Sequence, residues 1–272
     1  MLSISNIAWD VSLDDDVATL LNDLGVPHID VAPPKYFSVP SETTAEQVLT
    51  VKQYWNAKGI EPIGMQALLF GTAGLNVFGE EAVQARLLEH LTHICKIGDI
   101  LGARKLVFGS PRNRDRSHLD DIQTQEMAIS FFRRLGDIAK SNNVVVCLEP
   151  NPVCYQANFM TNSLDTEAVV RAIDHPHIRM QLDIGAMCIN EESPAEIIKA
   201  VAPVVHHIHI SEPQLAPLNK DNLFHLQAAD AIKTYLPNMP MTIEMLTTEN
   251  NASMAEISAA IELTQNIYGS TR

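Results

Sequence analysis

Short apolar stretches alternate with longer amphipathic segments along the whole chain. Eight stretches rich in Val, Ile, Leu or Met have the length of strands, and each is followed by a turn and a segment with helical periodicity. They are Ile4–Trp9, His28–Ala32, Pro62–Leu68, Lys105–Phe108, Val144–Leu148, Arg179–Ile184, Val204–Ile210 and Met241–Met245. The clearest helices are Glu80–Leu101 and Thr124–Ser141, where apolar residues recur at i, i+3 and i+4 opposite charged ones.

This alternation predicts an α/β protein with a parallel sheet. Strand–helix repeats connect neighbouring parallel strands through right-handed crossovers, and eight repeats close naturally into a barrel. We therefore expect a single (β/α)₈ TIM barrel domain covering residues 1–272. A doubly wound dinucleotide-binding fold is disfavoured, because no G-x-G-x-x-G turn follows the first strand, which ends at Trp9.

Composition and charge narrow the range of partners. The 272 residues are 46% hydrophobic, enough for one large core, and the formal net charge of -14 opposes binding to nucleic acid. The first residues do not resemble a signal peptide, and no apolar run approaches the ~20 residues that span a bilayer. We expect a cytoplasmic protein that binds neither nucleic acid nor membrane.

The cysteines give no indication of a disulfide framework or a zinc site. None of the four forms a C-x-x-C pair, and all fall in or beside apolar segments; they are Cys95, Cys147, Cys154 and Cys188. We expect reduced thiols that act as small core residues.

In a barrel of this type, the chemistry lies where the strands end in their C-terminal loops. Four consecutive strands end in or carry a residue that can bind a metal: Glu149, Asp183, His209 and Glu244. Successive members of this set, which we call the rim cluster, are 34, 26 and 35 residues apart, about one repeat each. The four side chains are therefore expected to meet at one mouth of the barrel.

The rim cluster predicts one bound divalent ion. Three converging carboxylates would repel one another without a cation, and three oxygens with one imidazole suit Mn²⁺, Mg²⁺, Co²⁺ or Zn²⁺. Structural roles are the alternative: Glu149 paired with an arginine, Asp183 capping the next helix, and His207 and His209 as core histidines. His209 lies nearer the strand end than His207, which favours His209 as the ligand.

The loop after the fourth strand carries three arginines that can contact an anionic substrate. Arg112 lies closest to the strand end and is the expected substrate contact. For Arg114 and Arg116 we favour a solvated loop in which they pair with Asp115 and Asp120.

Other polar and aromatic residues near strand ends are weaker candidates for substrate binding. Trp9 is placed to form an apolar wall against a sugar, and Lys35, Gln66 and Asn151 are placed to form hydrogen bonds with it. Each of the four has an ordinary loop or packing role as its alternative.

Several short motifs resemble those of the xylose isomerase-like barrel superfamily, in particular its ketose 3-epimerase branch. They are Leu148-Glu149-Pro150-Asn151, Leu182-Asp183, His207-Ile208-His209-Ile210-Ser211-Glu212 and Ile243-Glu244. The resemblance implies that the rim cluster binds the metal, with Mn²⁺ the first expectation, and that Glu149 and Glu244 form the acid/base pair. We also expect Glu212 and His207 to bind substrate, with an interior position in the barrel as the alternative for His207.

The chemistry of the cluster agrees with this implication. A metal that chelates a carbonyl and the neighbouring hydroxyl stabilises the enediolate formed when the adjacent carbon loses its proton. Two carboxylates acting as base and acid then give either epimerisation or aldose–ketose isomerisation of a keto-sugar or related small polyol. The expected partner is a small molecule, and a homo-oligomer is left open.

Two positions depart from the epimerase pattern. Ala186 stands where those enzymes have a substrate-binding histidine, and Leu215 stands where they have an arginine. The substrate therefore does not carry over from the resemblance. Three alternatives remain: a metal-dependent dehydratase of a keto-sugar or keto-inositol, an endonuclease IV-like phosphodiesterase, and a non-catalytic metabolite-binding barrel.

Overall fold

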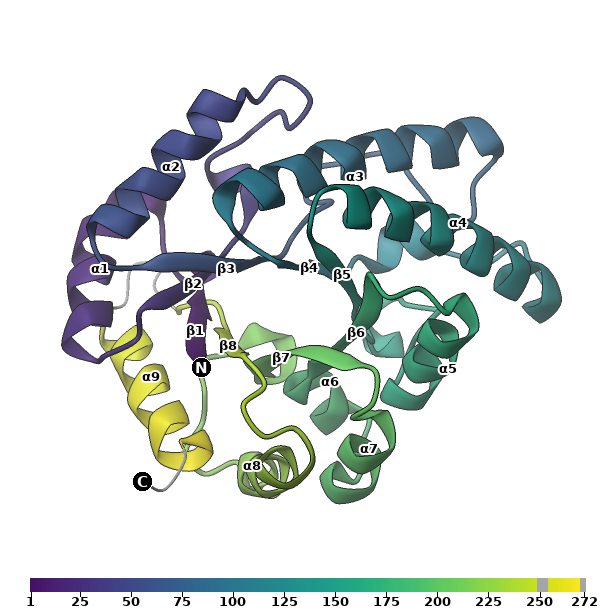
Figure 1. Cartoon of the computed structure of the whole chain (residues 1–272). Helices are drawn as coiled ribbons and strands as arrows, with labels where there is room; N and C mark the ends of the chain where they lie inside the picture. Colours follow the sequence, from purple (N-terminus) through teal and green to yellow (C-terminus); the bar gives the residue numbers. More distant parts are fainter. Residues whose placement is uncertain (249–253, 270–272) are drawn as a thin grey trace.

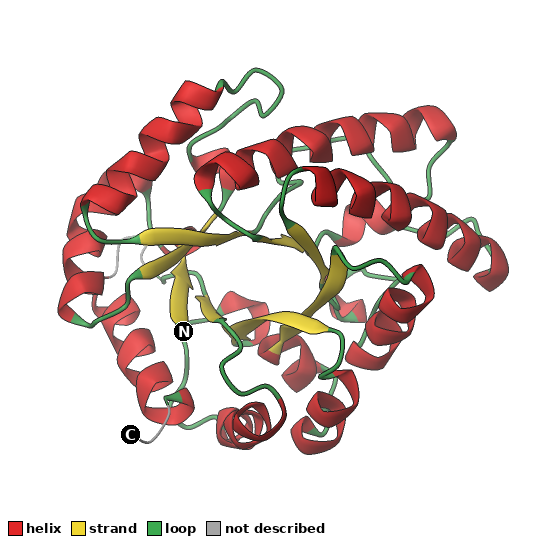
Figure 2. Ribbon diagram, viewed as in Figure 1, coloured by secondary structure: helices red, strands yellow, loops and turns green. Residues whose placement is uncertain are grey.

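A computed structural model describes residues 1–248 and 254–269. Eight parallel strands pair in chain order, and β1 pairs with β8 to close the barrel (Figures 1 and 2). The strands are β1 (Leu2–Ser5), β2 (His28–Val31), β3 (Glu61–Met65), β4 (Lys105–Phe108), β5 (Val145–Leu148), β6 (Ile178–Asp183), β7 (Val205–Ser211) and β8 (Met241–Glu244). The predicted (β/α)₈ barrel is confirmed.

The α-helices surround the barrel, as Figure 2 shows. They are α1 (Asp14–Asp23), α2 (Ala45–Ala57), α3 (Glu81–Leu101), α4 (Asp121–Ser141), α5 (Ser163–Ile173), α6 (Ile184–Ile189), α7 (Pro194–Val201), α8 (Leu223–Tyr235) and α9 (Met254–Tyr268). Both α6 and α7 lie between β6 and β7, so this crossover carries one helix more than a single repeat needs. None of the helices in the described residues is long and apolar enough to cross a membrane.

Local sequence explains where the two clearest helices begin and end. Asp120 caps α4, and its carboxylate accepts the backbone N–H of Gln123, whose side chain bonds back to the backbone of Asp120. Gly102 ends α3 in the left-handed conformation, with φ of 93°, which glycine adopts without steric cost. Both helices agree with the predicted segments to within a few residues.

The predicted first strand is too long at its C-terminal end. The strand stops at Ser5, whose hydroxyl accepts the N–H of Ile7 and starts a 3₁₀ turn over Asn6–Ala8. The buried Asn6 side chain accepts the backbone N–H of Ala32 at 2.7 Å. Since Ala32 directly follows β2, this bond joins the 3₁₀ turn to the end of the neighbouring strand.

The interior of the barrel holds a layer of polar side chains below its C-terminal mouth. The fully buried Asp30 accepts the hydroxyl of Ser3 at 3.1 Å, and its Oδ2 lies 3.0 Å from Nε2 of His207. Burial lowers the pKa of His207, so its neutral ring donates from Nε2 and accepts at Nδ1. The amide of Gln181, 2.8 Å from Nδ1, then donates to it and accepts the backbone N–H of His209 with its oxygen at 2.8 Å. We call Asp30, His207 and Gln181 the interior layer.

A glycine in β3 makes room for this layer. A Cβ atom on Gly64 would lie 2.4 Å from Oδ2 of Asp30, closer than unbonded atoms approach. The buried carboxylate therefore requires glycine at this position of the neighbouring strand.

Only part of the cysteine prediction is correct. Cys95 and Cys147 are buried, and burial raises the pKa of each thiol to about 12. Cys188 is partly exposed, and Cys154 is exposed on the loop after β5, so neither is a core residue. All four are free thiols.

Candidate metal centre and active site

The structure brings the four residues of the rim cluster together at the C-terminal mouth of the barrel. Glu149 directly follows β5, Asp183 ends β6, His209 lies in β7 and Glu244 ends β8. One donor atom from each lies within 4.8 Å of the others, and all four side chains are buried. Asp183 and His209 are directly paired across β6 and β7, so the sheet itself sets their relative position.

His209 is the centre of the rim cluster. Its Nδ1 atom lies 3.2 Å from Oε1 of Glu149, 3.1 Å from Oε2 of Glu244 and 3.9 Å from Oδ2 of Asp183. One ring nitrogen thus faces three carboxylates. Oε1 of Glu149 is buried and accepts no well-formed hydrogen bond, so it is a free donor atom for a cation.

Each of the two glutamates of the rim cluster accepts a hydrogen bond from one side-chain amide. Asn151 donates from Nδ2 to Oε2 of Glu149 at 3.1 Å, and Gln66 donates from Nε2 to Oε1 of Glu244 at 2.6 Å. Each glutamate therefore has one oxygen fixed by an amide and the other directed at His209. Such contacts fix the orientation of a metal ligand.

Asp183 both caps the helix that follows it and belongs to the rim cluster. Its Oδ1 accepts the backbone N–H of Ala186 and caps α6, as expected for an aspartate at a helix start. Its Oδ2 accepts the hydroxyl of Ser211 at 2.9 Å and faces the rim cluster. The capping bond therefore fixes the carboxylate without using the oxygen nearest His209.

Gly109, directly after β4, creates the space that Glu149 occupies. A Cβ atom at this position would lie 1.8 Å from Oε2 of Glu149, which is an outright overlap. Any larger residue would push the Glu149 carboxylate out of its position.

The electrostatics of the rim cluster favour a cation. Desolvation, together with the charges of Glu149 and Glu244, raises the pKa of Asp183 to about 8. Burial opposes a charged imidazole, yet Glu244 and Glu149 raise the pKa of His209 well above its ordinary value. Protons thus neutralise the cluster in the absence of other cations. Three carboxylates and one imidazole are a donor set that a divalent ion fits.

We expect binding of Mn²⁺ by the rim cluster to strengthen as the pH rises towards 8. Asp183, with its pKa raised to about 8, keeps a proton below that pH, and the ion must displace it. Because His209, whose pKa is raised well above its ordinary value, must also lose its proton, the apparent Kd should fall by about tenfold to 100-fold per pH unit between roughly pH 6 and 8. Isothermal titration in two buffers of different ionisation enthalpy measures both Kd and proton release. A pH-independent Kd without proton release would contradict this coupling.

Two cavities open beside the rim cluster, and both are lined by Glu149 and Glu244. The polar cavity, about 480 Å³ in volume, is also lined by Arg112, Asn151, Tyr155, Asp183, Ala186, Ser211, Glu212, Gln214 and Leu215. The apolar cavity, about 360 Å³, is lined by Ile7, Gln66, Leu68, Leu69, Phe70, Val107, Phe108, Leu215 and Leu246. A small molecule in either cavity reaches the two glutamates.

Four of the seven residues predicted to bind substrate line these cavities. Arg112, Asn151 and Glu212 belong to the polar cavity, and Gln66 belongs to the apolar cavity. His207 is fully buried in the interior layer, below the rim, where it touches Asp30 and Gln181 rather than a cavity. His207 therefore occupies the interior position that the sequence analysis gave as its alternative.

The proposed apolar wall at Trp9 is wrong. The indole is completely buried, packs edge-on against Trp55 with ring centroids 6.4 Å apart, and donates to Oδ1 of Asp14 at 2.8 Å. It lines neither cavity. Lys35 is also turned away from the cavities, because its ammonium group donates to the backbone oxygen of Trp9.

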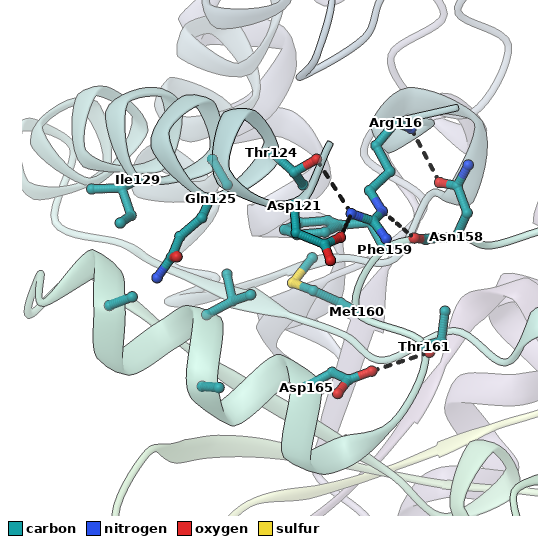
Figure 3. A pocket seen from close by; sticks show the side chains of 14 residues that line it. Arg116, Asp121, Thr124, Gln125, Ile129, Asn158, Phe159, Met160, Thr161 and Asp165 are labelled. Atoms are coloured by element: carbon teal, nitrogen blue, oxygen red, sulfur yellow. Dashed lines mark hydrogen bonds and ion pairs between the residues drawn. The ribbon is translucent and has the colours of Figure 1, made fainter. Parts of the chain in front are cut away.

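Arg114 and Arg116 also differ from the prediction. Arg114 is 1% exposed and donates to the side chain of Asn151, so it is a buried residue behind Glu149. Arg116 pairs with Asp121 and donates to the backbone oxygen of Asn158 (Figure 3). This contact lies in a pocket between α4 and α5, on the outside of the barrel.

Sequence reasoning missed the residues that support the rim cluster from behind. Asp30 and Gln181 were read only as strand residues, and Ser211 and Gly109 were not singled out. A signal existed for the first two, because a charged or amide side chain inside an otherwise apolar barrel strand needs a buried partner. The role of Gly109 depends on contact with the next strand and leaves no local signal.

The sequence model of the xylose isomerase-like TIM barrel family matches residues 18–238. The chain belongs to the xylose isomerase-like TIM barrel family. No curated protein matches the sequence of this chain.

Several solved structures share the fold of this xylose isomerase-like barrel. D-psicose 3-epimerase from Clostridium cellulolyticum H10 has 16% identity and a TM-score of 0.82, with 99% of each chain covered. For 3-keto-D-glucoside 4-epimerase from E. coli the identity is 15% and the TM-score 0.76, covering 97% of this chain and 98% of that one. L-ribulose 3-epimerase shows 17% identity and a TM-score of 0.74, over 95% and 86%. At these identities the likeness establishes the fold.

Proposed function

We propose that this protein is a divalent-metal-dependent isomerase or epimerase of keto-sugars, with the rim cluster as the metal site. The observation that carries the proposal is the gathering of three carboxylates and one imidazole within 4.8 Å, with two of the carboxylates lining both cavities. Mn²⁺ is the first candidate for the ion. The likeness in fold to two ketose 3-epimerases and a 3-keto-glucoside 4-epimerase supports the reaction class.

The two glutamates are the acid/base pair of the proposed reaction. The carboxylate of Glu149 takes the proton from the carbon beside the substrate carbonyl, with Oε1 facing the ion site and Oε2 the oxygen left for the proton. Glu244, which first gains a proton from solvent, gives that proton to the enediolate, and Glu149 later releases its own proton to solvent. Return to the same carbon from the other side inverts it, whereas return to the neighbouring carbon gives an isomer.

The other residues of the site hold substrate and ion in place. When bound, the ion would polarise the carbonyl and stabilise the negative charge of the enediolate. Asn151 and Gln66 keep the glutamates oriented as the proton moves, and Ser211 holds Asp183. The buried setting excludes bulk water from the carboxylates and strengthens their effect on the reacting carbon.

Proton exchange with solvent tests the proposal directly. The protein loaded with MnCl₂ is incubated in D₂O with a panel of ketoses, keto-acids and sugar phosphates, and the products are followed by NMR. We expect deuterium at one carbon beside the carbonyl of at least one sugar, together with its epimer or isomer. Loss of a β-hydroxyl would instead identify a dehydratase, and no exchange with any member would contradict the proposal.

A further inference from the structure

Three arginines lie on the short segment that follows β4, and only one of them is free. Arg114 is buried against Asn151, and Arg116 is paired with Asp121. Arg112 is exposed, and among residues 1–248 and 254–269 it has neither a hydrogen-bond nor an ion-pair partner.

Arg112 lines the polar cavity together with four acidic residues, yet none of them pairs with it. Three belong to the rim cluster. The fourth, Glu212, lies 3.2 Å from Nε2 of His225 and accepts hydrogen bonds from the backbone of Asn219 and the side chain of Asn222. Since none of the four acids pairs with Arg112, its charge is available for a molecule from outside.

No other lysine or arginine appears among the residues that line the polar or the apolar cavity. One further donor lies in the polar cavity. The hydroxyl of Tyr155 accepts the backbone N–H of Gln214 at 2.7 Å and, within the described chain, has no acceptor for its own hydrogen. By contrast, Ala186 and Leu215 offer no hydrogen-bonding side chain. The positive charge and this free donor thus come from Arg112 and Tyr155, which line the same cavity.

We propose that the substrate is a keto-sugar that carries an anionic group, and that Arg112 is the residue that selects it. This inference rests on the proposed function and names its substrate class. A guanidinium forms two parallel hydrogen bonds with a carboxylate or phosphate, and a single arginine matches the single charge of a carboxylate. Because Arg112 and the two glutamates line one cavity, a small sugar bound at the rim cluster can also reach the guanidinium.

Binding to the Mn²⁺-loaded protein tests the inference with three sugars that differ only at one end. D-fructose is neutral, D-fructuronate has a carboxylate at C6, and D-fructose 6-phosphate has a phosphate there. We expect the carboxylate to bind at least about tenfold more tightly than the neutral sugar in isothermal titration. Tighter binding of the phosphate than of the carboxylate would assign the anion as a phosphate.

The variant Arg112→Gln identifies the residue responsible. It should weaken binding of the anionic sugar by roughly 10- to 100-fold and change D-fructose binding less than about twofold. Arg134→Gln is the matched control, because it removes the same charge from an exposed position on α4. For any sugar that is turned over, Arg112→Gln should raise KM and leave kcat nearly unchanged.

The possible results separate the two proposals. Equal or absent binding of the anionic and neutral sugars, or an anion preference that survives Arg112→Gln, would overturn the assignment of Arg112. Proton exchange with neutral ketoses alone would do the same while leaving the isomerase proposal intact. An anion preference that depends on Arg112, without proton exchange for any of the three sugars, would support the anion site and count against the proposed reaction.

Discussion

Replacing Glu149 with glutamine is expected to lower kcat by about 10⁴-fold while the barrel stays folded. The amide that replaces the carboxylate cannot accept a proton from carbon at neutral pH, and it is a weaker ligand for a divalent ion. Its size is nearly unchanged, so it fits the space left by Gly109 and still meets Asn151. The measurement is the rate of proton exchange or epimer formation, with metal content determined on the same sample.

A surface variant separates this effect from a general loss of charge. Glu126 is exposed on α4, away from the rim cluster, and Glu126→Gln should keep full activity. If Glu149→Gln retained metal and stayed within tenfold of the parent kcat, Glu149 would not be the base. Loss of metal with recovery of activity at high Mn²⁺ would assign Glu149 to binding alone.

Removing the metal is expected to abolish turnover and to lower Tm. An ion at about 100 times its Kd stabilises the folded state by about 2.7 kcal/mol, since the unfolded chain does not assemble the four ligands. For a domain of this size this corresponds to a decrease of roughly 5 to 10 °C in Tm. Dialysis against a chelator, followed by thermal unfolding with and without added Mn²⁺, measures both effects.

Asp183→Asn provides the matched control for the metal effect. Asparagine still caps α6, but it removes a buried carboxylate whose pKa is raised to about 8 by desolvation and by its charged neighbours. Ionisation of that carboxyl costs stability as the pH rises from its unfolded pKa near 3.8 towards 8. At pH 8 the metal-free variant should therefore unfold at a higher temperature than the metal-free parent and gain less from Mn²⁺. Retained activity after chelation in the parent would contradict the metal assignment.

The fold and the rim cluster could be predicted because each depends on a regular sequence pattern. Parallel barrel strands are short apolar runs at nearly constant spacing, and the residue at the end of each run faces the mouth. Glu149 and Asp183 could therefore be placed from their position after apolar runs alone. For His209, choosing between two histidines of the same strand needed only their distance from the strand end.

The errors lie where contacts between distant residues decide the structure. Trp9 ends an apolar run, but its indole turns inward because Asp14 and Trp55 provide a buried acceptor and a packing surface. Arg114 belongs to a charged segment that reads as a solvated loop, and only the fold brings Asn151 next to it. Neither partner can be identified from the residues around Trp9 or Arg114.

The hydrogen bond that holds Glu244 also depends on a contact between distant residues. The sequence predicts a substrate contact for Gln66 because it lies near the end of the third predicted strand. In the structure its Nε2 donates to Oε1 of Glu244, a residue 178 positions later in the chain. The sequence is thus enough to place a residue near a strand end at the mouth of the barrel. The residue that it contacts there can be identified only from the structure of the closed barrel.

All four members of the rim cluster lie on β5 to β8 or directly after them, whereas Arg112 lies on the segment after β4. Gln66 after β3 and Gly109 after β4 support Glu244 and Glu149, so both must be kept. Within that limit, variation of the residues around Arg112 is expected to retune selectivity while the ligand geometry is retained. The chain is therefore a scaffold for directed evolution with libraries confined to the segment after β4, beyond Gly109.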